Sequence, residues 1–267
     1  MNEKYSDLIN KNHYEFGDLV RVLEALFAPD GCPWDREQTH ESLKRYLIEE
    51  SYEVLEAINL KDGERLCDEL GDVMLQVTFH AGIAKSFDIG DVITGVCKKM
   101  INRHPHVFGT VVANTSGEVL TNWESIKRRE KGQTEGRAQV LKGVPANLPA
   151  LMRAYKVQQK ARDAGFDWSD AAPVIEKIEE ELAELKQAVA SGDSVAVEEE
   201  FGDLLFAAVN LSRFINVHPE LALAAAVDKF IGRFEAMENM IIDENRSLEN
   251  MSLDEMDVYW ERAKAKR

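Results

Sequence analysis

The chain has 267 residues, of which 45% are hydrophobic and 30% are charged. This composition is typical of a packed globular protein, and the length suits one large domain or two of ordinary size. The formal net charge of −16 argues against partners such as nucleic acid or an anionic membrane surface. Three widely spaced cysteines without a CxxC motif argue against a disulfide framework and indicate a reducing compartment. We therefore expect a cytoplasmic protein, and no apolar run approaches the length of a membrane span.

Apolar residues recur at helical spacing along almost the whole chain. In the first half this spacing predicts helices over 16–27, from about 43 to 58 with Thr39 as the N-cap, over 66–77, over 90–102 and from 115 to about 129. In the second half it predicts helices over 150–164, from about 173 to 191, over 194–216 and over 220–242, with a terminal helix that a Ser252–Glu255 capping box begins. No segment shows the alternation of a strand, so the predicted class is all-α.

The composition changes between the two halves. Residues 131–149 contain three glycines and two prolines among mixed polar residues, which is typical of a linker. We therefore expect an N-terminal helical domain over 1–130, a linker over 131–149 and a C-terminal helical domain over 150–267. Because the order of elements recurs, the two domains should be similar helical bundles in tandem.

Two sets of four acidic residues share one spacing. The first set is Glu50, Glu53, Glu69 and Asp72, and the second set is Glu181, Glu184, Glu200 and Asp203. Each member of the second set lies 131 residues after its counterpart. Within each set the first pair belongs to an EExxE pattern and the second pair to an ExxD pattern with a glycine before the aspartate.

Residues three apart lie on one face of a helix, so each set places two carboxylates on one helix and two on the next. If those helices pack antiparallel, four carboxylates converge and repel one another unless protons or cations neutralise them. A single EExxE is most often a solvated helix face. Two sets in one register favour a site for hard divalent cations with oxygen ligands, namely Mg²⁺, with Mn²⁺ as the alternative.

Basic and aromatic residues follow each acidic set in the same order. A KxxxR pattern and then a WExxK pattern occur in each half: Lys99, Arg103, Trp123 and Lys127 in the first, and Lys229, Arg233, Trp260 and Lys264 in the second. Lysine and arginine can neutralise phosphate oxygens, and a tryptophan can stack on a base. Lys177, four residues before Glu181, lies on the same helix face and within reach of a phosphate bridged to the metal. These features together predict a nucleotide with several phosphates, which no P-loop would bind, since the chain lacks that motif.

In these motifs the chain resembles the MazG family of nucleoside triphosphate pyrophosphohydrolases in its two-domain bacterial form. The resemblance covers about residues 17–265 and rests on GCPWD, EExxE followed by ExxD, NRHPHVFG, GFDW and EEFGDLLFA. It implies an all-α fold, a homodimer and Mg²⁺-dependent hydrolysis of a nucleoside triphosphate to the monophosphate and pyrophosphate. It also implies that Glu181, Glu184, Glu200 and Asp203 hold the metal and form the catalytic centre, and that Lys177, Lys229, Arg233 and Trp260 bind the nucleotide.

The two halves are not equally equipped. Tyr46 stands in the first half where the second has Lys177, so we expect the second half to carry most of the turnover and the first-half carboxylates to form a weaker metal set. Ala196 stands where a longer polar side chain could have helped to hold the ligand. Glu180 is a candidate general base, and an ordinary solvated glutamate is an equal alternative.

Three functions remain open from the sequence. The first is a pyrophosphohydrolase that tolerates many bases, which the duplication and the broad resemblance favour. The second is a narrower enzyme of the dUTP or phosphoribosyl-ATP pyrophosphatase type. The third is a regulatory protein that senses nucleotides and hydrolyses them only incidentally.

Overall fold

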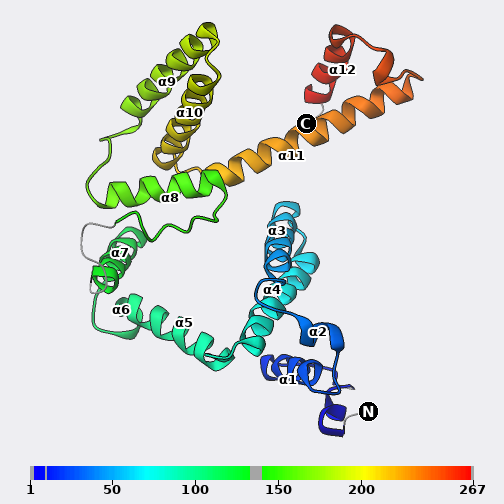
Figure 1. Cartoon of the computed structure of the whole chain (residues 1–267), viewed down its shortest axis with the longest axis vertical. Helices are drawn as coiled ribbons and strands as arrows, with labels where there is room; N and C mark the ends of the chain where they lie inside the picture. The colour runs from blue at the N-terminus through cyan, green and yellow to red at the C-terminus, as the bar shows by residue number, and fades with distance from the viewer. Residues whose placement is uncertain (1–2, 10, 133–139, 266–267) are drawn as a thin grey trace. The chain divides into compact units, whose positions relative to one another are not determined.

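The computed structural model describes residues 3–9, 11–132 and 140–265. Its contacts divide the chain into two compact units, Met1–Lys131 and Gly132–Arg267. The described residues form helices and contain no strand, which confirms the all-α class (Figure 1). No helix among them is long and apolar enough to cross a membrane. The three cysteines are free, and Cys67 and Cys97 are exposed.

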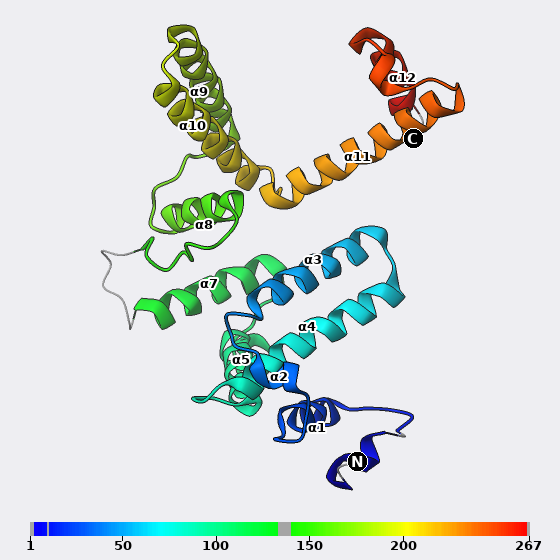
Figure 2. The same ribbon diagram turned by 45° about the vertical axis from the view of Figure 1, so that its right-hand side comes forward.

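The first unit is built around a hairpin of two long helices. Its elements are η1 (Glu3–Leu8), α1 (Phe16–Phe27), α2 (Pro33–Glu37), α3 (Lys44–Leu60), α4 (Gly63–Ile83), α5 (Ile89–Arg103), α6 (Pro105–Phe108) and α7 (Ser116–Gly132). Helices α3 and α4 lie side by side along their length (Figure 2). A core of Leu23, Leu43 and Phe79 holds α1 against this hairpin, and the Phe27 and Phe79 rings meet edge to face at 4.9 Å.

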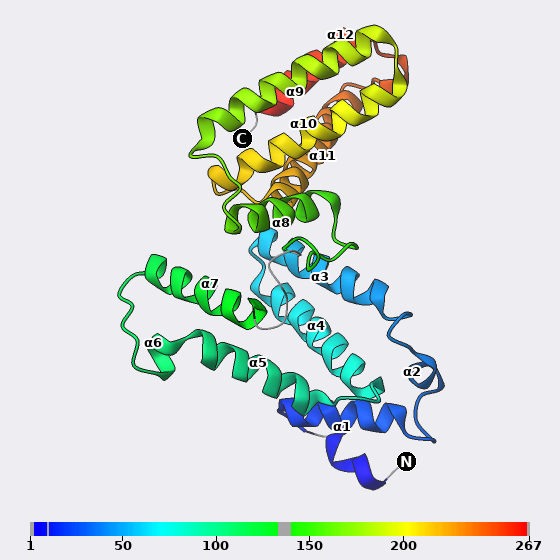
Figure 3. The same ribbon diagram turned by 60° about the vertical axis from the view of Figure 1, so that its left-hand side comes forward.

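The second unit repeats the hairpin. Its elements are α8 (Ala150–Asp163), α9 (Ala171–Ser191), α10 (Ser194–Phe214), α11 (Pro219–Asp243), η3 (Leu248–Asn250) and α12 (Leu253–Ala265). Helices α9 and α10 pack along each other, and α8 packs against α10 (Figure 3). A buried cluster lies between α11 and α12 and contains Met237, Ile241 and Tyr259.

Both hairpin turns consist of two residues with the same roles. The first residue has a left-handed backbone conformation and ends the preceding helix; it is Lys61 at φ 57° in the first unit and Gly192 at φ 74° in the second. The second residue is an aspartate that caps the next helix: Asp62 accepts from the backbone N–H of Glu64 and Arg65, and Asp193 accepts from those of Val195 and Ala196. These turns preserve the 131-residue register, so they place both acidic sets on the same two helices of their hairpins.

Several predicted boundaries differ from the structure, most of all those of α4, which the spacing predicts over 66–77 and which extends over Gly63–Ile83. Helix α3 begins at Lys44, because Thr39 exchanges hydrogen bonds with Ser42 and closes a turn before the helix. Helix α4 begins at Gly63, and only Lys61 and Asp62 separate it from α3. In the segment predicted as the linker, α7 continues through Gly132, residues 133–139 lie outside the described residues, and 140–149 contain no helix.

Candidate functional site

The α9–α10 hairpin brings the second acidic set together. Glu181 and Glu184 lie on α9, and Glu200 and Asp203 lie on α10. Glu181, Glu184 and Glu200 each place a carboxylate oxygen within 4.8 Å of the other two. Asp203 is exposed and stands outside this trio, although its charge acts on Glu200. The helix faces and the turn thus bring together three of the four carboxylates that were expected to converge.

The separation of the three oxygens suits a small cation. At least two of the three oxygen pairs around one octahedral Mg²⁺ must be adjacent, at about 3.0 Å, since each oxygen lies about 2.1 Å from the ion. The oxygens of the trio lie within 4.8 Å of one another, so a pair would close by at most about 2 Å on binding such an ion, a distance within the reach of side-chain rotation. A larger oxygen-loving cation such as Ca²⁺ would need even less movement.

The electrostatics of this cluster favour a positive ligand. Burial raises the pKa of Glu200, and the charges of Glu184, Glu181 and Asp203 raise it further. Each contribution reflects the cost of holding several negative charges close together in surroundings partly withdrawn from water. A divalent cation would reverse these effects, because each carboxylate would then face a positive charge.

Lys177 supplies the positive charge that the protein itself places here. Its Nζ lies 2.7 Å from Glu181 Oε1 and 2.7 Å from Glu180 Oε1. The hydrogen bonds to Glu180 and then Glu181 raise the pKa of Lys177, so its ammonium stays charged at neutral pH. Glu181 is only 6% exposed, whereas Glu180 lies on the surface and pairs with Lys177.

The first acidic set also converges in part, on the α3–α4 hairpin, but with Asp72 in its trio where the second half has Glu184. Glu50, Glu69 and Asp72 place one carboxylate oxygen each within 4.8 Å of one another. Glu53 stands outside this trio, but the charge of Glu69 and a hydrogen bond to it raise the pKa of Glu53. The pKa of Glu50 is raised as well, first by burial and then by the charge of Asp72.

A further charged residue, Arg65, belongs to this first site, and the motifs of the sequence do not include it. Arg65 on α4 forms ion pairs with Glu56 on α3 and with Glu69, whose Oε1 lies 3.4 Å from Arg65 Nε. The available signal was the Arg-x-x-x-Glu spacing of Arg65 and Glu69, which places both on one helix face. The contact with Glu56 could be found only after the helices were paired.

The remaining predicted nucleotide contacts lie on other elements. Lys229 and Arg233 lie on α11, which packs against α8 and α12. Helix α11 begins near the end of α10 and runs in a different direction from it (Figures 1 and 2). Trp260 on α12 packs beside Phe230, with ring centroids 5.1 Å apart. The structure therefore brings Lys177 to the carboxylates but leaves Lys229, Arg233 and Trp260 on helices that do not line them.

The corresponding first-half residues contact one another. Lys127 Nζ lies 4.6 Å from the centre of the Trp123 ring, and the Arg103 guanidinium lies 5.7 Å from it. Arg103 also donates to Glu130, with an Nη2–Oε2 distance of 2.7 Å. In the first unit the basic and aromatic elements of the repeat thus join α5 to α7.

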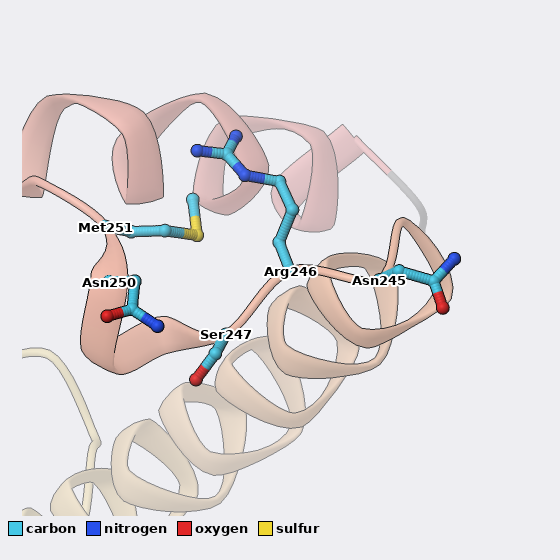
Figure 4. A pocket seen from close by; sticks show the side chains of 5 residues that line it. All are labelled: Asn245, Arg246, Ser247, Asn250 and Met251. Atoms are coloured by element: carbon cyan, nitrogen blue, oxygen red, sulfur yellow. The ribbon is translucent and has the colours of Figure 1, made fainter.

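A shallow hollow lies at the turn between α11 and α12. It is lined by Asn245, Arg246, Ser247, Asn250 and Met251 (Figure 4). The Arg246 guanidinium extends toward α12 and pairs with Glu255. None of the predicted site carboxylates belongs to these elements, so the hollow is separate from the acidic clusters.

Comparison with known proteins agrees with the duplicated geometry. The MazG nucleotide pyrophosphohydrolase domain matches twice, at residues 38–108 and 170–237, and each match contains one acidic set. A nucleoside triphosphate pyrophosphohydrolase/pyrophosphatase MazG from Thermotoga maritima is 50% identical over 252 residues, which cover 93% of this chain and 95% of the relative.

Two further relatives extend the comparison. A nucleoside triphosphate pyrophosphohydrolase from Escherichia coli is 41% identical over 254 residues, covering 92% of this chain and 95% of the relative. The uncharacterized protein YabN of Bacillus subtilis is 45% identical over 256 residues, which cover 94% of this chain and 52% of the relative. With two domain matches and full-length relatives of this identity, the chain belongs to the MazG nucleotide pyrophosphohydrolase family.

Proposed function

We propose that the chain hydrolyses nucleoside triphosphates to nucleoside monophosphates and pyrophosphate, with Mg²⁺ held by the α9–α10 carboxylates. The observation that carries the proposal is the convergence of Glu181, Glu184 and Glu200 within 4.8 Å on a hairpin that matches the family domain. Asp203 completes the ligand set. Mn²⁺ has the same preference for oxygen ligands and should replace Mg²⁺.

The ion and the protein have separate tasks in this proposal. A bound divalent cation supplies charge stabilisation on phosphate oxygens and lowers the pKa of a water molecule. Glu181, Glu184, Glu200 and Asp203 hold that ion, and Lys177 can turn from Glu180 to a phosphate oxygen because its partner Glu180 is exposed. Glu180 would then be able to accept a proton from the attacking water, which keeps it as the candidate base.

The proposed nucleotide site also includes Lys229, Arg233 and Trp260. We propose that a homodimer brings these residues of one copy to the carboxylates of the other. Helix α11 exposes Leu223, Val227, Phe230 and Phe234 at intervals of four, three and four residues, which form one apolar stripe. On α10, Leu205 and Phe206 are exposed too, whereas Val209 is already buried within its own unit. A second copy of the chain would cover such faces and could bring Lys229 and Arg233 to the carboxylates.

A panel of nucleotides separates the candidate functions. We expect pyrophosphate release from purine and pyrimidine triphosphates in Mg²⁺, because the names of the relatives specify no base. Turnover of dUTP alone, or of phosphoribosyl-ATP alone, would favour the narrower enzymes. Tight nucleotide binding without turnover would favour the regulatory sensor.

Hydrolysis of inorganic pyrophosphate is a second candidate activity. The Thermotoga maritima relative carries pyrophosphatase in its name and is 50% identical to this chain. The panel should therefore include pyrophosphate as a substrate, with orthophosphate as the measured product. If orthophosphate appears from pyrophosphate, then orthophosphate formed from a triphosphate does not by itself indicate attack at the γ-phosphorus.

A further inference from the structure

The first-half carboxylates have an internal cation that bridges the two helices of their hairpin. Arg65 on α4 pairs with Glu56 on α3 and, one turn further along its own helix, with Glu69. Glu69 is a member of the converging trio, and its side chain is 13% exposed. Because a guanidinium does not lose its proton in proteins, this positive charge is permanent.

The second half lacks both partners of this bridge. In the 131-residue register, Arg65 corresponds to Ala196 and Glu56 corresponds to Gln187. Among the described residues of the second unit, no basic side chain forms an ion pair with Glu200, the counterpart of Glu69. Glu200 is therefore available to an external cation, whereas Glu69 already has an internal one.

The second half has its cation at a different place. Lys177 and both of its partners, Glu180 and Glu181, lie on α9, so this cation does not bridge the hairpin. Its first-half counterpart is Tyr46, which the Arg45 guanidinium covers at 4.4 Å from the ring centre. Both hairpins thus contain one cation per acidic set, but only that of the first half is fixed to both helices.

We propose that Arg65 is a built-in counterion that lowers the affinity of the first-half carboxylates for a divalent cation relative to the second half. This inference rests on the proposed function, since it assumes that the acidic sets take such an ion. A divalent cation entering the first site must share Glu69 with Arg65 and approach a fixed positive charge. Arg65 thereby makes the second half the preferred metal site.

The test measures Mn²⁺ binding to the first half alone, by electron paramagnetic resonance of free Mn²⁺. The background chain carries Glu200→Gln and Asp203→Asn, which remove second-half ligands without removing the first-half set. In this background Arg65→Gln should tighten Mn²⁺ binding about tenfold, the order expected for removing one unit charge near a divalent ion in partly solvated surroundings. Unchanged or weaker binding, including no binding with either residue at 65, would overturn the proposal.

Matched variants separate charge from hairpin geometry. Glu56→Gln breaks the bridge to α3 but keeps the positive charge beside Glu69, so it should not tighten Mn²⁺ binding. Arg65→Lys should likewise stay within about twofold of the background, since the charge remains. If Glu56→Gln tightens binding as much as Arg65→Gln, then loosening of the hairpin is the cause and the counterion role is wrong.

The reciprocal change transfers the bridge to the second half. Ala196→Arg together with Gln187→Glu should weaken Mn²⁺ binding there about tenfold, measured in a chain whose first half carries Glu69→Gln and Asp72→Asn. The same first-half background without the transferred pair tests the proposed function separately. If that background binds no Mn²⁺, the proposed metal site fails; if it binds and the transferred pair has no effect, only the role of Arg65 fails.

Discussion

Keeping several neighbouring carboxylates ionised at neutral pH costs free energy, and both halves of the chain contain such a group. In the second set, burial and the charges of acidic neighbours raise the pKa of Glu200. Removing one ligand of a cluster should weaken metal binding and misplace the attacking water. We therefore expect Glu200→Ala or Asp203→Ala to lower kcat at least ~100-fold, the loss seen when one preorganised stabilising group is deleted.

The first-half counterparts serve as the internal comparison for this prediction. Glu69→Ala and Asp72→Ala should lower kcat much less, because Arg65 already neutralises part of that cluster and the first half lacks a counterpart of Lys177. Circular dichroism on all four variants checks that each remains folded. If the first-half variants are inactive and the second-half variants are active, the catalytic site lies in the first half. If all four variants keep wild-type kcat, neither acidic cluster is the catalytic centre.

The raised pKa values of Glu50, Glu53 and Glu200 predict a pH dependence of stability. Burial is the first cause for Glu50 and Glu200, and the charge of Glu69 is the first cause for Glu53. Since the folded state binds these protons more tightly than the unfolded state, their contribution is present below the ordinary pKa of 4.5 and is lost as pH rises through the raised values.

This dependence can be measured by thermal unfolding in chelator and in Mg²⁺. In chelator, the contribution of these carboxylates to Tm should fall as pH rises from about 4.5 toward neutrality. At pH 7, Mg²⁺ should raise Tm because it binds the folded carboxylates. The Glu200→Ala, Asp203→Ala double variant should show a smaller Mg²⁺ effect; an equal effect would mean that the ion acts elsewhere.

At the residue scale, spacing alone placed each acidic set on one pair of helices, because a three-residue interval fixes the helix face, but it did not show that Glu53 and Asp203 would stand outside the converging trios. It did not predict the Arg65–Glu56 pair, which joins two helices and depends on how they are paired. Nor did it indicate that Lys177 would pair with Glu180 as well as with Glu181, which lies on its helix face. These contacts depend on rotamers and packing rather than on local pattern.

At the element scale, the hairpin turns determine whether the carboxylates face one another. Asp193 caps α10 by accepting from Val195 N–H at 3.0 Å and Ala196 N–H at 3.3 Å. Asp193→Ala should lower the free energy of unfolding by about 1 kcal/mol, the usual cost of losing an N-cap acceptor. Urea denaturation measures this value, and Asp193→Asn, which can still accept, should retain most of the stability.

Helix positions followed well from apolar periodicity, and helix starts followed less well. The predicted stripe over 16–27 coincides with α1, whereas α3 begins at Lys44 rather than after a Thr39 cap. Thr39 does act as a cap, but for the turn that its exchange with Ser42 closes. A capping residue identifies a turn of backbone and cannot by itself show whether a helix continues from it.

At the scale of the whole molecule, the direction of α11 is the feature that the sequence did not predict. Its stripe of Leu223, Val227, Phe230 and Phe234 continues into Met237 and Ile241, which α12 covers. Periodicity identifies an apolar face but not what packs against it. The structure leaves the first part of the stripe exposed, which is why we assign its cover to a second copy.

Two measurements test that assignment. Sedimentation at micromolar concentration should give the mass of a dimer or a larger assembly, and a strictly monomeric mass would contradict it. Co-expression of Glu200→Ala with Arg233→Ala should restore turnover that neither variant has alone, because a mixed dimer would contain one site with intact carboxylates and an intact α11. No restoration in demonstrated mixed dimers would mean that each chain supplies its own Arg233.

Divalent cations at the acidic clusters should direct the hydrolysis of a triphosphate to a monophosphate and pyrophosphate. The most direct test is ³¹P NMR of ATP incubated with the chain in Mg²⁺ and in excess chelator. We expect the signals of AMP and pyrophosphate in Mg²⁺ and no turnover in chelator, since the unneutralised carboxylates would repel both one another and the substrate. Formation of ADP and orthophosphate, or full turnover in chelator, would contradict the proposed function.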